Sequence, residues 1–293
     1  MHLFVQSIII GVLIGGVYAL LASGMTMMFG VTRIINFAQA MFAIVCAYLS
    51  YSLFTHFGLD PFLSVAILMP MMFLFGYGVY TLLLRRLGKA GPAMALMVLF
   101  ALGIGAQGVT DLVYGTNPIT ITPFYANDSW VVFGFQIPVI RFFAFVMAVA
   151  VLGAFHLIRQ HSKLGRALRA TSQNPAAASL LGVDVQKMSA IATGLGFAAA
   201  GAAGPVYGLI FPFTGNSQYD LLSKLLTVMI LGGLVSMPGV IIAAVFLGVV
   251  ESVIAATISP DWSSFSFLVA LFIVLMVRPQ GIFGGHRMQG ALW

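Results

Sequence analysis

Residues 159–187 read RQHSKLGRALRATSQNPAAASLLGVDVQK and lie between two long charge-free runs. Five residues of this stretch are Lys or Arg, and its single acid is Asp184. Loops on the cytoplasmic side of a membrane carry an excess of Lys and Arg. The stretch therefore predicts a basic cytoplasmic loop that joins two membrane spans.

The second half of this loop carries the start and stop signals of a short helix. Asn174 is a good N-cap, and Pro175 suits the first helical position, where its missing N–H costs nothing. Residues 176–181 favour or tolerate a helix, and Gly182 suits a left-handed stop. At 1.5 Å per residue the predicted helix is about 10 Å long.

The residues before this helix also separate by polarity on a possible helix. One face would hold Leu164, Ala167, Leu168 and Thr171, and another Lys163, Arg166 and Arg169. A capped helix in a basic loop is either a docking element for a cytoplasmic partner or part of a loop that simply follows the positive-inside rule.

The composition identifies a membrane protein. Of the 293 residues, 61% are hydrophobic and only 7% are charged, and the mean hydropathy is +1.07. A soluble domain has about 25% charged residues. The apolar runs are long and do not alternate, which excludes a transmembrane barrel and predicts helices. We expect an all-α polytopic bundle, one transmembrane domain over 1–293, in which the net charge of +6 lies in loops and does not indicate nucleic acid binding.

Charge-free runs and Gly/Pro punctuation predict about eight or nine spans. The full spans are 5–29, 36–55, 62–84, 92–113, 139–158, 188–210, 240–258 and 263–277, and 211–224 is a loop. Gly232-Gly233 and Pro238-Gly239 break the run at 225–258 and leave a half-length helix near 225–239. We expect the first run to be an uncleaved span, because no basic residue precedes it.

The basic residues orient the chain in the membrane. Of the 13 Lys and Arg residues, all except Arg141 and Lys224 fall on one face of the predicted topology. That face is cytoplasmic by the positive-inside rule, which places the N-terminus outside and the C-terminus inside. This arrangement needs an odd number of crossings, so either the half-length helix also crosses or one terminus is misplaced.

No motif indicates catalysis. The chain has no Walker A pattern, so we expect no ATP hydrolysis by this chain, and no His/Cys cluster has metal-binding spacing. Glu251 is the only acid deep inside a predicted span. It is either a pathway or proton-relay residue or a structural tie to a neighbouring helix. We expect the structural tie, because no basic partner is predicted at its depth.

Three further features are candidates for a pathway or gate. The broken helix at Gly232 and Gly233 is either a transport element at membrane depth or a cytoplasmic turn. Asn36 and Gln39 open the second span, and we expect helix capping rather than a gate. The glycines of the sixth span, Gly201 and Gly204 among them, indicate close helix packing.

Several motifs along the whole chain resemble those of a known family. They are GGVYALLASG at 15–24, INFA at 35–38, GRA at 165–167, Asn174-Pro175, LGV at 181–183, Gly232-Gly233, Gly239, Gly248, Glu251 and RPQGIFG at 278–284. In this order the chain resembles the permeases of branched-chain amino acid ABC importers, of the LivH/LivM type and closer to LivH.

The resemblance implies a heterodimer of two permeases, two cytoplasmic ATPases that bind ATP and Mg²⁺, and an extracytoplasmic solute-binding protein, in a bacterial inner membrane. It implies that the 159–187 loop holds a coupling helix seated in an ATPase groove. The contact would come from Asn174, Pro175, Ala177, Leu180, Leu181 and Gly182, with electrostatic support from Arg166 and Arg169.

The resemblance leaves the substrate class open. Gln39-Ala40 and VSMPG at 235–239 depart from the common family pattern near possible pathway elements. Branched-chain or other hydrophobic amino acids lead, and urea or short amides are alternatives. A rival hypothesis is an ion-coupled secondary transporter that uses Glu251, which would need charge partners within the membrane.

Overall fold

The computed structural model describes residues 2–87, 91–132 and 134–277. Lys89, Arg287 and the RPQGIFG motif at 278–284, which entered the sequence predictions, lie outside the described residues. The elements are α1 (His2–Thr32), α2 (Gln39–Phe57), α3 (Pro61–Val79), a π-helical turn (Tyr80–Leu84), α4 (Arg85–Leu87), α5 (Pro92–Tyr114), β1 (Ser129–Val132), β2 (Phe135–Pro138), α6 (Val139–His161), α7 (Lys163–Gln173), α8 (Pro175–Leu180), α9 (Val185–Ile210), α10 (Ser217–Gly232), α11 (Met237–Thr257) and α12 (Pro260–Val277).

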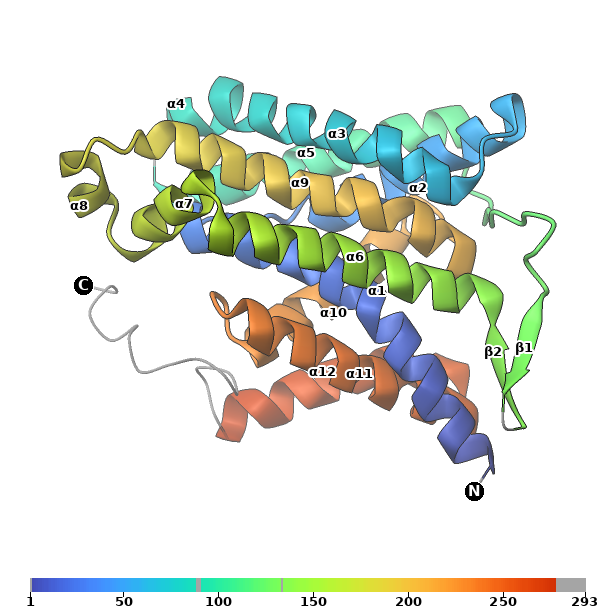
Figure 1. Cartoon of the computed structure of the whole chain (residues 1–293). Helices are drawn as coiled ribbons and strands as arrows, with labels where there is room; N and C mark the ends of the chain where they lie inside the picture. Colours follow the sequence, from blue (N-terminus) through green and yellow to red (C-terminus); the bar gives the residue numbers. More distant parts are fainter. Residues whose placement is uncertain (1, 88–90, 133, 278–293) are drawn as a thin grey trace.

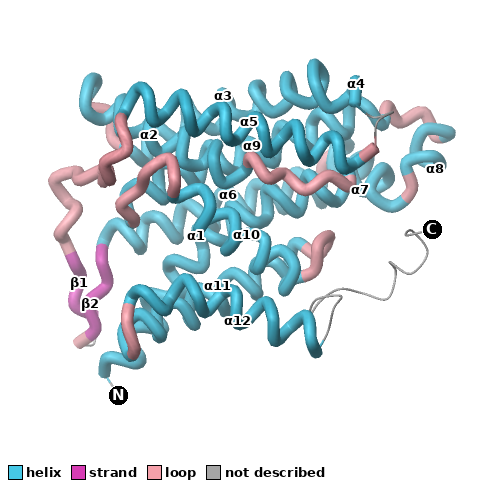
Figure 2. The backbone as a smooth tube through the Cα atoms, turned by 180° about the vertical axis from the view of Figure 1, so that it is seen from behind, coloured by secondary structure: helices cyan, strands magenta, loops and turns pink. Residues whose placement is uncertain are grey.

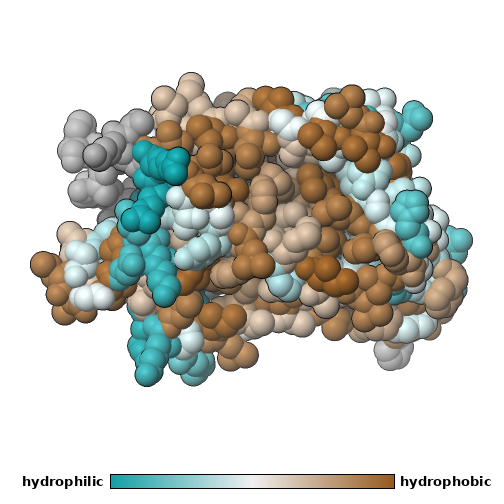
Figure 3. All heavy atoms as spheres, turned by 90° about the horizontal axis from the view of Figure 1, so that it is seen from above, coloured by the Kyte–Doolittle hydropathy of each residue, from teal (hydrophilic) through white to brown (hydrophobic). Residues whose placement is uncertain are grey.

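The long helices form a bundle that suits a membrane. Within the described part of the chain, seven helices are long and apolar enough to cross one: α1, α2, the continuous stretch 61–87, α5, α6, α9 and α11. The helices α10 and α12 are shorter and lie beside α11 (Figure 2). On the face drawn in Figure 3, apolar side chains cover the middle and hydrophilic ones gather toward the ends. The predicted all-α membrane bundle is confirmed.

Helix α9 is the centre of the bundle, and α1, α2 and α3 pack around it (Figure 1). Its most apolar 18-residue window is 100% buried. Glycines make this close approach possible. A Cβ atom at Gly201 would lie 2.6 Å from the carbonyl oxygen of Leu68 in α3, and one at Gly204 would lie 2.3 Å from that of Ala43 in α2. The predicted packing role of these glycines is confirmed.

We expect Gly204→Ala to destabilise the bundle by about 1–3 kcal/mol, because the new methyl group would overlap backbone atoms. Gly105→Ala in α5 is the matched control, since a Cβ atom there meets nothing within 4 Å. Alanine is also the better helix former, so the control protein should be as stable as the original or slightly more stable. Thermal unfolding of the two detergent-solubilised variants measures the difference. An equal Tm for both would contradict the packing role.

The predicted polar segment 114–138 contains a small antiparallel hairpin, β1–β2, that the sequence analysis did not anticipate. The His2 ring stacks on the Phe135 ring with centroids 4.6 Å apart, and a His2 ring nitrogen lies 3.0 Å from the carbonyl oxygen of Gly134. The hairpin therefore shares one end of the bundle with the start of α1, and α8 lies at the opposite end (Figure 1).

The prediction of a loop at 211–224 is wrong, because α10 already begins at Ser217. The charges of Asp220 and Lys224 favoured a loop in the sequence, yet both lie on the helix. The predicted break is confirmed. Helix α10 ends at Gly232, Gly233 has φ +90°, and the Ser236 side chain accepts a hydrogen bond from the Gly239 N–H at the start of α11. The chain reverses at this turn, so α10 and α11 pack side by side.

Candidate functional site

The short helix α8 forms as its caps predict. The Asn174 side-chain oxygen accepts a hydrogen bond from the Ala177 N–H at 3.0 Å, and Pro175 is the first helical residue. Gly182 has φ +81°, so the left-handed stop is also confirmed. Helix α8 stands out from the end of the bundle (Figure 1). Leu180 and Leu181 at its tip are 89% and 83% exposed.

Helix α7 connects this tip to the bundle. Its N-cap is Ser162, whose hydroxyl accepts a hydrogen bond from the Gly165 N–H at 2.8 Å. Leu168 and Thr171 on its apolar face are buried, as the pattern predicts. Because α7 is packed on one side and continues directly into α8, a force on the exposed tip would reach the bundle through it.

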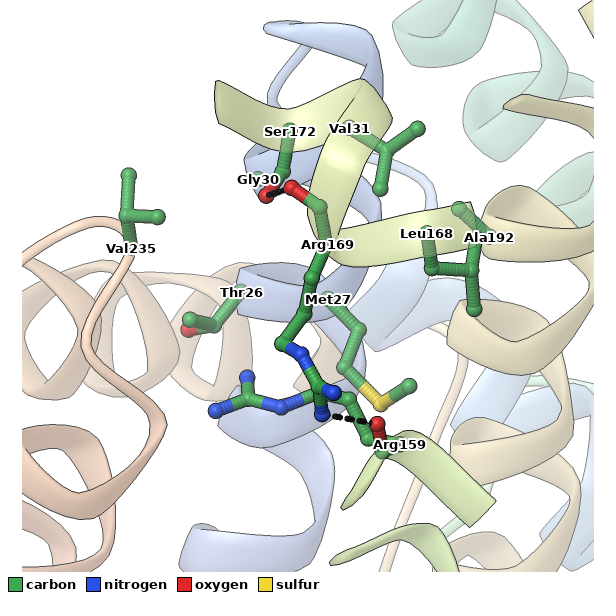
Figure 4. A pocket seen from close by; sticks show the side chains of 10 residues that line it. All are labelled: Thr26, Met27, Gly30, Val31, Arg159, Leu168, Arg169, Ser172, Ala192 and Val235. Atoms are coloured by element: carbon green, nitrogen blue, oxygen red, sulfur yellow. Dashed lines mark hydrogen bonds between the residues drawn. The ribbon is translucent and has the colours of Figure 1, made fainter. Parts of the chain in front are cut away.

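The two arginines predicted to support docking are placed differently. Arg166 is exposed on the outer face of α7. Arg169 turns back toward the bundle and donates a hydrogen bond to the carbonyl oxygen of Arg159 (Figure 4). Arg169 is therefore engaged within this chain, and Arg166 is the one free to face a partner.

Arg169 lines a pocket at which four helices and the α10–α11 turn meet. The lining residues are Thr26, Met27, Gly30, Val31, Arg159, Leu168, Arg169, Ser172, Ala192 and Val235 (Figure 4). They come from the end of α1, from α6, α7 and α9, and from the turn between α10 and α11. Arg33 adds a direct tie, because its guanidinium donates a hydrogen bond to the Ser172 carbonyl oxygen at 3.1 Å. Movement of α7 would therefore press on α1, where a Cβ atom at Gly30 would lie 3.7 Å from the Val235 side chain in the α10–α11 turn.

Asn36 and Gln39 are buried and hydrogen-bonded. The Asn36 amide donates to the Gln39 side-chain oxygen at 3.0 Å, and the Gln39 amide donates to the Gly196 carbonyl oxygen in α9 at 2.9 Å. Helix α2 begins at Gln39 after Ala38, which makes no side-chain cap. The Asn36 side-chain oxygen also accepts a hydrogen bond from the Ala38 N–H at 3.1 Å, in the turn that leads into α2, which is consistent with the expected capping. Gln39 lies in the first turn of α2 and ties it to α9.

The glycine pair Gly232-Gly233 at the end of α10 allows the chain to reverse direction between α10 and α11. A Cβ atom at Gly232 would lie 2.5 Å from the Val240 Cα atom in α11. Gly233 adopts a left-handed φ that disfavours other residues. Both glycines are thus explained by the tight contact of α10 with α11.

Glu251 has a basic partner, contrary to the sequence analysis. Its carboxylate lies 2.7 Å from the Lys224 ammonium, and both side chains are only 9% exposed. Lys224 also pairs with Asp220 at 2.9 Å, one helical turn earlier in α10. The rings of Tyr18 and Phe267 lie 5.8 and 5.6 Å from the ammonium, within range of a cation–π interaction. The cluster joins α1, α10, α11 and α12.

This cluster lies near the middle of the bundle. Lys224 is nine residues before Gly233, about 13 Å along α10 from the turn at 1.5 Å per residue. Glu251 is 14 residues after Met237, about 21 Å along α11 from the same turn. The sequence contained one signal for it: the four-residue spacing of Asp220 and Lys224, which stabilises a helix.

Among the described residues, no group of three or more His, Cys, Asp or Glu side chains could hold a metal ion. The candidate site has three features. They are the exposed tip of α8, the pocket between α7, the end of α1 and the α10–α11 turn, and the buried ion cluster around Lys224.

Known proteins with similar sequences are transport permeases. Residues 7–276 match the family model described as the branched-chain amino acid transport system permease component. The chain is 30% identical to the probable branched-chain amino acid transport permease LivH of Methanocaldococcus jannaschii, over 90% of this chain and 88% of that protein. It is 27% identical to the high-affinity branched-chain amino acid transport system permease proteins LivH of Salmonella typhimurium and BraD of Pseudomonas aeruginosa, in each case over 98% of this chain and 97% of the relative. No solved structure matches with significance.

These matches give no support to the rival hypothesis of an ion-coupled transporter that uses Glu251. They place the chain among multi-pass membrane subunits of transport systems rather than among enzymes. The chain belongs to the family of branched-chain amino acid transport system permease components.

Proposed function

We propose that this chain is the membrane permease subunit of a bacterial ABC importer for branched-chain or other hydrophobic amino acids. The names of the relatives support the substrate class. The observation that carries the mechanism is the exposed tip of α8, where the side chains of Leu180 and Leu181 are open to a partner. Two adjacent apolar side chains in a polar loop fit an apolar groove on a partner.

The partners that we propose are a second permease subunit, two cytoplasmic ATPase subunits that bind ATP and Mg²⁺, and an extracytoplasmic solute-binding protein. The coupling contact consists of Asn174, Pro175, Ala177, Leu180, Leu181 and Gly182, with Arg166 beside it. ATP-driven closure of the ATPases would displace α8. Helix α7 would pass this movement to the end of α1, to which it is tied by the Arg33–Ser172 hydrogen bond, and from Gly30 of α1 to Val235 in the α10–α11 turn.

The orientation of the chain in the membrane is inferred from the basic residues at the α8 end of the bundle. Arg33, Arg85, Arg86 and the basic residues of 159–187 lie at or near the helix ends that surround α8. We place this end in the cytoplasm of a cell with the protein in its inner membrane. The start of α1 and the β1–β2 hairpin are then outside, and α12 runs toward the cytoplasm.

Affinity purification of the tagged chain from native membrane in mild detergent tests the assembly. We expect mass spectrometry to identify a second permease and ATPase subunits in the same preparation. Reconstituted in proteoliposomes with the solute-binding protein, the complex should take up leucine only when ATP is supplied to the ATPase side. ATP-independent uptake of leucine by this chain alone would contradict the proposal.

A further inference from the structure

One side of α10 is polar and exposed, although the helix belongs to a membrane bundle. Asn216, Tyr219, Asp220 and Ser223 are all exposed, and their spacing places them along one face of the first two turns. In the second half of the helix the residues on this side are apolar or buried, Leu226 and Thr227 among them. The polar face therefore covers only the half of α10 that is nearer the hairpin end.

Helix α5 extends this face. The Gln107 amide donates a hydrogen bond to the Asn216 side-chain oxygen at 2.7 Å, and the Tyr219 hydroxyl donates one to the Gln107 side-chain oxygen at 3.1 Å. The Gln218 amide also donates to Gln107. These side chains hold one another in place, so α5 and α10 present a continuous polar wall.

This polar wall is unsuited to contact with lipid or with a second membrane helix. Polar and ionisable side chains within a membrane face the bundle interior or a water-filled cavity, since their transfer to lipid costs several kcal/mol. Helix–helix contacts in membranes favour small residues, whereas this face carries Tyr, Asp and Asn. An aqueous pathway satisfies all of these side chains.

The charge of the wall is negative. Lys224 is shared by Asp220 and Glu251, so the three groups have one cation for two carboxylates. The two buried members pair with each other, whereas the Asp220 side chain is 46% exposed on the polar face. A carboxylate presented in this way complements an ammonium group, which amino acids carry and urea and simple amides lack.

We infer that the polar face of α10 lines the solute pathway and that Asp220 receives the ammonium group of an amino acid as it passes. This inference rests on the proposed permease function and adds both the wall of the pathway and a reason for its substrate class. Lys224, which is itself paired with Glu251, holds Asp220 in place from behind, and the neutral hydrogen-bonding groups of Tyr219 and Ser223 line the same route.

Cysteine accessibility in the intact importer tests this inference. In a Cys46→Ala background, Ser223→Cys is exposed to a water-soluble cationic methanethiosulfonate reagent, with Phe272→Cys as the control. Phe272 is 66% exposed on the apolar side of α12 and should face lipid. We expect Ser223→Cys to be labelled at least tenfold faster than Phe272→Cys, and leucine to slow this labelling during ATP turnover while urea does not.

The role of Asp220 is tested in the same assay. Asp220→Asn should raise the leucine concentration for half-protection of Ser223→Cys about tenfold, the loss expected for one charge-assisted hydrogen bond. Asp220→Glu should restore most of the protection. Lys224 keeps Glu251 as a partner in both variants.

The outcomes separate this inference from the proposed function. A complex that takes up leucine with ATP but leaves Ser223→Cys as unreactive as Phe272→Cys would overturn the pathway wall and leave the permease function intact. Crosslinking of Ser223→Cys to the second permease would also overturn it. If Ser223→Cys does not assemble, Tyr219→Cys on the same face replaces it, with the same expectation.

Discussion

Replacement of both Leu180 and Leu181 by Asp is expected to abolish ATP-driven solute uptake while the bundle remains folded and inserted. The two side chains are 89% and 83% exposed, so their replacement removes almost no contact within this chain. If they fill an apolar groove on an ATPase subunit, two carboxylates in that groove would cost several kcal/mol. The thermal stability of the isolated chain should therefore be unchanged, and the effect should appear in the assembled importer.

Leucine uptake and ATP hydrolysis by the reconstituted complex measure this effect. Uptake should fall by at least a hundredfold, and hydrolysis should no longer respond to the loaded solute-binding protein. The matched control is Gln173→Asp, which adds a carboxylate at an exposed position two residues before α8 and outside the proposed contact. Normal coupling in the double variant would remove α8 from the mechanism, whereas equal loss in the control would point to loop charge instead.

The second large effect is expected from Lys224→Met, which would leave Glu251 without its basic partner inside the bundle. Removing one member of a buried ion pair costs about 3–5 kcal/mol, because the remaining charge stays desolvated. We expect a lower Tm and a lower yield of folded protein. The loss should exceed that of Lys187→Met, a control at an exposed lysine near the start of α9.

The double variant Lys224→Met/Glu251→Gln distinguishes an ion pair from simple packing. Replacing both members of a buried pair with neutral groups is much less costly than removing one. The double variant should therefore recover much of the stability that Lys224→Met loses, with a coupling energy between the sites. Additive losses of stability, or a Lys224→Met variant as stable as the original, would show that the pair does not hold α10 and α11 together.

The buried ion pair also bears on the rival hypothesis of an ion-coupled secondary transporter. That hypothesis requires a charge partner for Glu251 within the membrane, and the structure supplies one in Lys224. The family match over residues 7–276 gives that hypothesis no support. The Lys224–Glu251 ion pair is accounted for as a tie between α10 and α11.

The features that the sequence determined by itself depend on neighbours a few residues apart. Helix α8 follows from Asn174, Pro175 and Gly182, which cap and stop one short helix within nine residues. The long spans follow from hydropathy, because a helix in lipid must satisfy its own backbone and present apolar side chains along its length. The break between α10 and α11 follows from the glycines that allow a tight reversal.

The tertiary structure alone decided which distant groups meet. Lys224 and Glu251 are 27 residues apart and come together because the turn after Gly233 folds α11 back against α10. Burying a single charge in a membrane costs free energy, so the sequence predicted that Asp220 and Lys224 lie in a loop. The predicted helix therefore began at residue 225, eight residues after the actual start of α10 at Ser217. In the fold the opposite charges satisfy each other, so the helix can begin at Ser217 and carry them inside. Likewise, the Gln39 side chain donates to the carbonyl oxygen of Gly196, 157 residues away in α9, and no local pattern encodes this contact.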